Sequence, residues 1–402
     1  MFSDNSYPAI AKPLIVSFVC VLLNGISYGF GVYLFPMVMP EMIKDLHLNY
    51  THAGTINGVS QAATLFTIPI AWYLTRRLGG LRLIVLCQLV GGILLAALSF
   101  VQDYYSLIII NFFIRGWPVL VWIPLVVIAT EHIEVKWRAT MLTAASSGQC
   151  FFIFIDGILS SFFLEHYHWR SLWQVVALIC LLSCCCCFVM LKLVGAWDHS
   201  IKAKGARSRI KTELFQWMKA RNGIIVMSLF AITGFTFVSF QMYLASFLRD
   251  ELGVGLEVAA VMWSVMGISG ILGGVTIGVI TDRIGVKASF SVVFTMALLS
   301  TVLICLPLNS VSILAMAVLF GVSQAAVHGL GPAYIAKTLS PGLVTAAFSS
   351  ATMIFVFGAM AGNFIGGWSG GAFGSFAGFY IFVGIFFIIG AVLSFGLQRE
   401  RL

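Results

Sequence analysis

The chain has 402 residues, of which 60% are hydrophobic and only 9% are charged. Soluble proteins are about 45–50% apolar and about 25% charged, so this composition excludes a soluble domain and indicates a chain whose surface faces lipid. The 23 Lys and Arg residues against 15 Asp and Glu give a net charge of +8. Most of these basic residues lie in loops between apolar segments, where they set membrane topology, so we expect no nucleic-acid partner.

Twelve apolar segments are long enough to span a bilayer as helices, since a span needs about 20 mostly apolar residues. They are predicted near residues 13–39, 52–75, 82–102, 105–130, 139–164, 172–194, 223–248, 256–280, 287–307, 311–336, 343–368 and 373–397. An even number places both termini on one side, and 19 Lys and Arg residues fall on that side against 3 on the other. The sequence therefore predicts an all-α integral membrane protein of the cell (inner) membrane with both termini cytoplasmic.

The longest hydrophilic stretch divides the spans six and six. It predicts an N-terminal half over 1–194, a cytoplasmic linker over 195–222 and a C-terminal half over 223–402. The halves resemble each other: Thr75-Arg76-Arg77-Leu78-Gly79 follows the second span, and Thr281-Asp282-Arg283-Ile284-Gly285 follows the eighth, 206 residues later. Two six-helix repeats in the same orientation are typical of secondary transporters.

The loop after the eighth span indicates a family. Gly278-Val279-Ile280-Thr281-Asp282-Arg283-Ile284-Gly285-Val286-Lys287 resembles the G-x-x-x-D-R-x-G-x-K signature of the major facilitator superfamily, although the first-half copy has Trp72 and Arg76 in place of Gly and Asp. Trp169-Arg170-Ser171-Leu172-Trp173 resembles the family's W-R-x-x-F/W entry to the sixth span. The resemblance covers all twelve spans and implies two halves that alternate around a central site. It also implies a gating loop formed by Gly278, Asp282, Arg283, Gly285 and Lys287.

Positive-inside charge alone would account for Arg283 and Lys287, but not for Asp282 and the two glycines. Further glycines recur every four residues in the eighth and eleventh spans, and small residues at this spacing let helices approach closely. The resemblance places spans two, five, eight and eleven between the halves. We therefore expect this interface to contain the following glycines: Gly270, Gly274, Gly278, Gly358, Gly362, Gly366 and Gly370.

Two ionisable residues lie deep inside the spans. Arg115 lies about ten residues into the fourth span and Asp156 about eight residues into the fifth from the same side, so we expect them at similar depth and facing each other. A charge at the centre of a spanning helix costs at least ~2.5–3.5 kcal/mol and needs a partner or water. Two interpretations remain open: a static salt bridge, or an Arg115 that binds an anionic substrate with Asp156 as counter-ion or proton carrier.

The tenth span carries Gln324 and His328 on one face, and His328 is either a packing residue or a proton-coupling group. The resemblance implies that spans one, four, seven and ten line the cavity. The candidate substrate-binding residues are then Arg115, Asn24, Tyr28, Trp122, Gln241, Tyr243 and Gln324.

The expected function is secondary active transport of a small anionic or zwitterionic organic solute by a monomer, coupled to protons or another ion. The P-loop, H-E-x-x-H and G-x-S-x-G motifs are absent, so we expect no ATP drive, no enzyme activity, no cofactor and no metal. One alternative is an exporter of drugs, siderophores or metabolites, although Gly148 to Gly157 lack the proline-centred pattern of drug antiporters. A second alternative is a receptor or sensor that transports nothing. The stretch from Ser27 to Tyr33 resembles the monocarboxylate and oxalate/formate branch, yet the eighth span lacks that branch's internal charges, which leaves the subfamily open.

Overall fold

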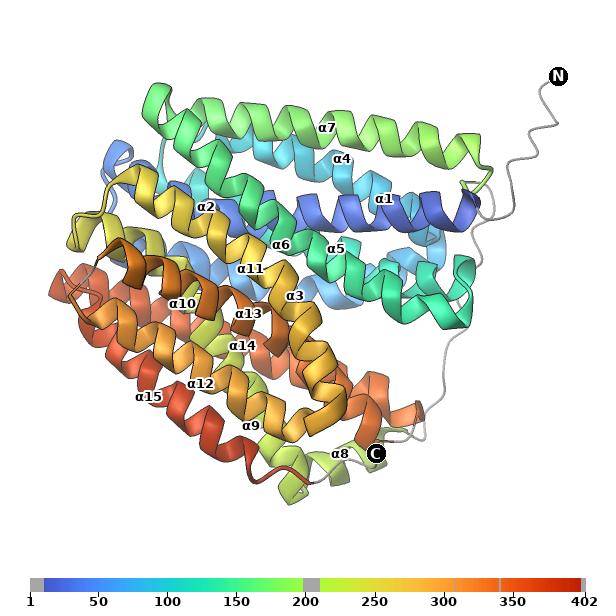
Figure 1. The fold of residues 1–402 in the computed structure, drawn as a ribbon. Helices are drawn as coiled ribbons and strands as arrows, with labels where there is room; N and C mark the ends of the chain where they lie inside the picture. The colour runs from blue at the N-terminus through green and yellow to red at the C-terminus, as the bar shows by residue number, and fades with distance from the viewer. Residues whose placement is uncertain (1–10, 198–209, 308, 340, 399–402) are drawn as a thin grey trace.

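The computed structural model describes residues 11–197, 210–307, 309–339 and 341–398, and every regular element within them is helical (Figure 1). Eleven helical stretches in this part of the chain are long and apolar enough to cross a membrane. The predicted second span is the helix α3, which has 29 residues but is more polar than the others. Its buried side chains include Asn57, Ser60 and Gln61, and it packs along two neighbouring helices of the bundle.

The predicted spans of the N-terminal half form eight helical segments, because the first span is interrupted by a π-helix. They are α1 (Ala11–Tyr28), η1 (Gly29–Tyr33), α2 (Leu34–Asp45), α3 (Tyr50–Leu78), α4 (Gly80–Leu98), α5 (Tyr104–His132), α6 (Val135–His166) and α7 (Trp169–Leu193).

The spans of the C-terminal half follow the same order, with two π-helices in the seventh span. They are α9 (Arg221–Thr233), η2 (Gly234–Val238), α10 (Ser239–Ser246), η3 (Phe247–Glu251), α11 (Leu256–Ile284), α12 (Val286–Cys305), α13 (Ser310–Thr338), α14 (Pro341–Phe373) and α15 (Ala377–Ser394). A short helix that the sequence pattern did not predict, α8 (Ile210–Lys219), lies inside the predicted linker and packs against α9 and α14.

The two halves repeat each other in the residues that shape the backbone. Gly79 and Gly285, which join α3 to α4 and α11 to α12, both have positive φ angles, of 85° and 87°, a conformation that strongly favours glycine. Asp103 and Asn309 occupy matching positions and accept a hydrogen bond from the third residue of α5 and α13. The tight turn between α11 and α12 therefore explains why the predicted gating loop contains Gly285.

The halves lie close together at one end of the bundle and spread apart towards the end that carries the basic loops (Figure 1). We call these the outer and the inner end. Across the halves, α3 packs along α14 and α6 along α11. A Cβ atom built on Gly367 of α14 would lie 2.3 Å from the Cα of Gly54, and one built on Gly157 of α6 would lie 2.6 Å from the carbonyl oxygen of Ala260. Both contacts lie on the outer side of the helix midpoints.

The predicted glycine track in the eleventh span faces its own half. The positions of a Cβ on Gly358, Gly362 and Gly366 are blocked by the seventh span, and Gly370 meets Phe376. The contact with the other half is made by Gly367 and Gly371, which approach Gly54 and Thr51 of α3. In the eighth span, a Cβ built on Gly270 would lie 2.9 Å from the sulfur of Cys150 in α6, and one on Gly274 would meet Ala325 of its own half. A Cβ on Gly278 would meet no neighbouring atom within 4 Å. The expectation that these glycines lie between the halves was thus wrong for most of them. A repeat of glycines every four residues indicates a close contact with another helix, but it does not show which helix that is.

Candidate functional site

Four side chains from both halves lie near the middle of the spans, and we call them the central cluster. They are Arg115, Gln241, Met242 and Gln324. The Gln324 Nε2 atom donates a hydrogen bond to Oε1 of Gln241 at 2.5 Å, and this bond joins α13 to α10. Both amides are almost fully buried, and Nε2 of Gln241 has no partner among the described residues.

Arg115 is the charged member of the central cluster. Its side chain is 6% exposed, and its Nη2 atom lies 3.9 Å from the sulfur of Met242, which belongs to the opposite half. The Nε atom is buried without a hydrogen-bond partner in the described part of the chain. A thioether sulfur is a weak acceptor, so this contact does little to compensate the buried charge. Within the described ranges, no carboxylate forms an ion pair with Arg115.

The expectation that Arg115 and Asp156 face each other is wrong. Asp156 is fully buried, and neither of its carboxyl oxygens has a hydrogen-bond partner among the residues that the structure describes. One turn earlier on the same face of α6, Phe152 packs against η1: its ring lies 5.3 Å from that of Phe30. Asp156 therefore lies in the seam between α6 and the first span. The position of a residue along its span predicts its depth in the membrane, but not the direction in which its side chain points. Arg115 and Asp156 therefore lie at similar depth and face different neighbours.

His328 lies one turn inward of Gln324 and is exposed, unlike the central cluster. Its Nδ1–H donates a hydrogen bond to the carbonyl oxygen of Gln324 at 2.7 Å, and its ring contacts that of Phe355 at 6.0 Å. This geometry leaves Nε2 as the nitrogen that can accept a proton.

The remaining predicted substrate ligands are spread around the cluster. Tyr28 is half-buried, with its ring 6.5 Å from that of Tyr33, and Trp122 is half-buried two turns inward of Arg115. Asn24 donates a hydrogen bond to the carbonyl oxygen of Ala145 at 2.9 Å and so fixes α1 against α6. Tyr243 is a packing residue.

The packing of Tyr243 explains why the cavity prediction failed for it. Its hydroxyl donates to the carbonyl oxygen of Asn363 at 2.5 Å, and its ring stacks on Phe376 at 5.2 Å. It therefore faces α14 within its own half, while Gln241, two residues earlier, faces the centre.

Of the predicted gating loop, Arg283 is exposed and Lys287 is half-buried. The side chain of Asp282 lies outside the described residues, so its role in the gating loop stays a prediction. The described ion pairs between the halves lie instead at the outer end, in a group we call the outer contact cluster. Lys44 binds Asp250 at 2.7 Å, Arg249 binds Glu41 at 2.5 Å, and the hydroxyl of Tyr50 donates to Asp250.

Sequence reasoning counted Lys44 and Arg249 only as topology signals and did not select this cluster. A signal was present, because Lys44 and Asp250 are separated by the same 206 residues that relate the two halves. Neighbouring acids repeat in the same way. Asp45 accepts hydrogen bonds from Trp169 and Arg170 at the start of α7, and Glu251 accepts from Ser375 and from the backbone of Phe376 at the start of α15.

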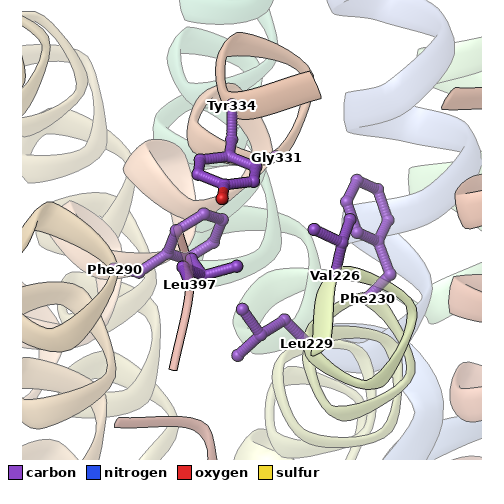
Figure 2. A pocket seen from close by; sticks show the side chains of 7 residues that line it. All are labelled: Val226, Leu229, Phe230, Phe290, Gly331, Tyr334 and Leu397. Atoms are coloured by element: carbon purple, nitrogen blue, oxygen red, sulfur yellow. The ribbon is translucent and has the colours of Figure 1, made fainter. Parts of the chain in front are cut away.

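A small cavity at the inner end of the C-terminal half is not a site for a solute. It is apolar, holds about 10 Å³ and lies between α9, α12 and α13, as Figure 2 shows. The hydroxyl of Tyr334 near it already donates to Asn222 and to the carbonyl oxygen of Gln398. A volume of this size holds at most one water molecule.

Comparisons with known proteins agree with this architecture. The model of the Major Facilitator Superfamily matches residues 21–311. A bacterial homologue of the human lysosomal transporter Spinster, solved in an inward-facing and unoccupied conformation, matches with a TM-score of 0.75 and 15% identity, covering 97% of each chain. The nucleoside transporter NupG, in a mutant form, matches with a TM-score of 0.76 and 13% identity, covering 96% of this chain and all of the other. No curated protein matches the chain. With a family model that covers most of its length and a fold shared with solved transporters, this chain belongs to the major facilitator superfamily and is a multi-pass membrane protein of the secondary transporter class.

Proposed function

We propose that this protein transports a small anionic organic solute by alternating access, with Arg115 as the group that binds the anion. The observation that carries the proposal is the isolation of Arg115. Its guanidinium group is buried near the middle of a membrane-spanning helix, its Nε has no partner among the described residues, and the hydrogen-bond contact described for its Nη2 is a sulfur atom. An unpaired buried charge costs several kcal/mol, and an anionic ligand would offset that cost when it binds.

The surroundings of Arg115 support a solute site over a structural one. The two amides of Gln241 and Gln324 supply donors and acceptors from the opposite half, and a solute bound between these amides and Arg115 would contact both halves at once. Because the halves approach each other at the outer end and separate at the inner end, the site would open towards the cytoplasm in this conformation. A ligand that contacts both halves can bias their relative orientation, which alternating access requires.

We further propose that the solute is coupled to protons through Asp156 or His328. Within the described ranges, Asp156 has no cation and no donor at hydrogen-bonding distance, so the neutral carboxyl is much cheaper to bury than the carboxylate. The matching position in the C-terminal half is Gly362, where a Cβ would lie 2.4 Å from the carbonyl oxygen of Phe235. The fold therefore does not need a side chain at this position, which favours a functional role for Asp156.

A stabilisation screen tests the anion site. The purified protein is heated with sodium lactate, benzoate or nicotinate, and each acid is compared with its uncharged amide. We expect at least one acid to raise the melting temperature while its amide does not, because a ligand that binds the folded state stabilises it by mass action. Arg115→Gln should abolish that shift, and Arg77→Gln, which removes an exposed charge at the inner end of α3, should keep it. Equal stabilisation of the wild type and Arg115→Gln by every acid would overturn the proposal.

A further inference from the structure

An open groove lies between three helices of the C-terminal half, and we call it the lateral groove. It holds about 500 Å³ and is lined by side chains of α11, α12 and α13, among them Ile268, Leu272, Met296, Val318 and Val322. Ile268, Leu272 and Val318 are 43%, 65% and 42% exposed, so the groove is open to the surface of the molecule. Sites for small molecules have volumes of about 300–1,000 Å³, and the lateral groove falls within that range.

The connection between the three helices produces the groove. α11 and α12 meet in the tight turn at Gly285, beside which the hydroxyl oxygens of Thr281 and Ser289 lie 2.8 Å apart. From this inner end α11 and α12 diverge, and both pack along α13 (Figure 1). Gly273 brings α11 close to α13, since a Cβ built on it would lie 2.5 Å from Val322. The lateral groove is the space that remains between α11 and α12 over the surface of α13.

The lateral groove faces lipid and not the other half. α11 packs on α6 through Gly267, where a Cβ would lie 2.7 Å from the carbonyl oxygen of Cys150. Successive residues of an α-helix are rotated by about 100°, which directs Leu272 and Thr276 away from that contact. α11 is also one of the helices long and apolar enough to span the membrane. The groove therefore opens to the bilayer, on the side of α11 that lies away from the central cluster.

The lining of the groove suits a hydrocarbon chain. Two of the residues that line it, Ser269 and Thr276, carry hydroxyl groups. Ser269 donates to the carbonyl oxygen of Met266 at 3.1 Å, and Thr276 donates to that of Leu272 at 2.8 Å. Both hydroxyl groups thus already donate within their own helix, and the rest of the lining is apolar. A polar solute would lose its hydration there without gaining hydrogen bonds, whereas an acyl chain loses none.

Two basic residues lie at the inner end of the groove. Arg283 follows Thr276 by seven residues, so it lies on the same face of α11, about 10 Å further along, and its side chain is exposed. Lys287, the second residue of α12, is half-buried. The groove itself extends along α11 from Ile277 to Val265, which is about 18 Å of helix, and the hydrocarbon of one leaflet is about 15 Å thick. A phospholipid of the cytoplasmic leaflet therefore fits with its chain in the groove and its phosphate near both cations.

The same combination is missing from the N-terminal half. The positions 206 residues before Leu272, Val318 and Lys287 hold two bulkier aromatic residues and an uncharged one, namely Phe66, Phe112 and Leu81. Small aliphatic side chains next to two cations are thus particular to the C-terminal half, and the repeated fold does not require them.

We propose that the lateral groove binds one acyl chain of an anionic phospholipid of the cytoplasmic leaflet, whose phosphate is bound by Arg283 and Lys287. A basic residue near anionic lipid raises the affinity roughly fivefold, so two should favour an anionic over a zwitterionic headgroup roughly twenty-five-fold. This lipid site is independent of the proposed anion site, because it faces the bilayer and needs neither Arg115 nor a solute.

Native mass spectrometry of the full chain in neutral detergent tests the role of the cations. The protein is titrated with phosphatidylglycerol or with phosphatidylcholine, and the apparent Kd of each is measured. The wild type should bind one phosphatidylglycerol at least tenfold more tightly than phosphatidylcholine. Arg283→Gln combined with Lys287→Gln should remove that preference. Arg77→Gln removes the residue that matches Arg283 in the first half and should keep it.

A second pair of variants tests the groove itself. Val318→Phe places in the groove the residue that the first half has at the matching position, and it should weaken the binding of both lipids. Each CH₂ group that loses its contact lowers the affinity roughly fourfold, so a phenyl ring that displaces two should raise the Kd roughly tenfold or more. Val392→Phe makes the same change on α15, at a side chain that is 63% exposed and outside the groove, and should leave both Kd values unchanged.

Three outcomes would overturn the inference. They are equal binding of the two lipids by the wild type, wild-type binding of phosphatidylglycerol by Val318→Phe, and a dimer that forms as the lipid is excluded, which would make the groove an interface between two copies. None of these results bears on the anion site, which is tested with acids and Arg115→Gln. Melting temperatures of the lipid-free variants within a degree or so of the wild type would exclude misfolding as the cause of weaker binding.

Discussion

The N-terminal and C-terminal halves are alike where residues shape the backbone and different where polar side chains lie inside the spans. Gly79 matches Gly285, and Asp45 matches Glu251. Arg115 and Asp156 have glycines, Gly321 and Gly362, at the matching positions of the other half. Both of those glycines are tightly packed. The repeated residues therefore account for the fold, and the unmatched polar residues are the ones that the fold does not require.

The largest effect is expected where the halves touch through glycines. In Gly367→Ala, the added Cβ would lie 2.3 Å from the backbone of Gly54, and overpacking of this kind costs about 1–3 kcal/mol. Alternating access would separate this contact when the outer ends open, so the change should favour the outward-open conformation roughly tenfold to hundredfold. Distances between labels at the outer ends of α7 and α15 measure this shift.

The matched control for Gly367→Ala is Gly378→Ala, where no atom lies within 4 Å of the new Cβ. Its distance distribution should equal that of the wild type. An unchanged distribution in Gly367→Ala would mean that α3 and α14 adapt to the extra carbon. The close approach at Gly54 and Gly367 would then not control the balance between the two conformations.

A smaller effect is expected from removing an unmatched polar residue. Asp156→Asn cannot exchange a proton, so we expect proteoliposomes to lose accumulation of the solute driven by a pH gradient and to retain exchange of solute for solute. With one proton per solute, a gradient of one pH unit drives roughly tenfold accumulation, and that factor is what the variant should lose. Counterflow and gradient-driven uptake of the same labelled acid provide the two measurements.

Two further variants complete the experiment on Asp156. Glu165→Gln changes an exposed acid at the outer end of the same helix and should leave both activities intact. His328→Gln tests the other candidate for the proton. If Asp156→Asn accumulates the acid normally and His328→Gln does not, His328 and not Asp156 is the residue that takes up the coupled proton.

The fold could be predicted almost completely from the sequence, because hydropathy, basic loops and the repeated Gly285 loop are local signals. The π-helices were not predicted, since an inserted residue inside an apolar span leaves the hydrophobic pattern intact. The central cluster was predicted in part. Arg115, Gln241 and Gln324 were selected because polar groups in lipid are rare, but the rotation of each helix, which separates Asp156 from Arg115 and turns Tyr243 away, depends on packing that no short pattern encodes.

A still smaller effect is expected at the outer contact cluster. Lys44→Ala or Asp250→Ala should weaken the outer-closed state by about 0.2–1 kcal/mol, the usual range for an exposed ion pair. Lys44→Asp combined with Asp250→Lys should restore it, because the two residues occupy matching positions and the exchange keeps the pair. Label distances across the outer end form the double-mutant cycle. Additive losses, with no recovery in the exchanged protein, would show that the pair does not contribute.

The last prediction concerns the stability of the fold and not the balance between conformations, at the caps of α5 and α13. The backbone N–H of Ser106 donates to Asp103 and, with the Ser106 hydroxyl, lowers the pKa of that carboxyl below its usual value. A lowered pKa in the folded state means that the stabilisation is present above the unfolded pKa and is lost as the pH falls through the folded one. The penalty of Asp103→Ala should thus disappear in acid. Asn309→Ala removes a neutral cap at the matching position and should cost about 1 kcal/mol at every pH. Melting temperatures measured between neutral and acidic pH give the stability loss of each variant. If the loss in Asn309→Ala also changed with pH, the charge of Asp103 would not explain the difference between the two caps.

The ion pair between Lys44 and Asp250 also has a consequence for the symmetry of the two halves. Two residues that occupy matching positions of a repeat and touch each other lie on its pseudo-two-fold axis. Two identical halves would carry the same residue at both positions, and a charged residue there would lie against its own copy and be repelled. An ion pair at this place therefore requires the two halves to differ. It is a contact that a symmetric pair of identical halves could not make.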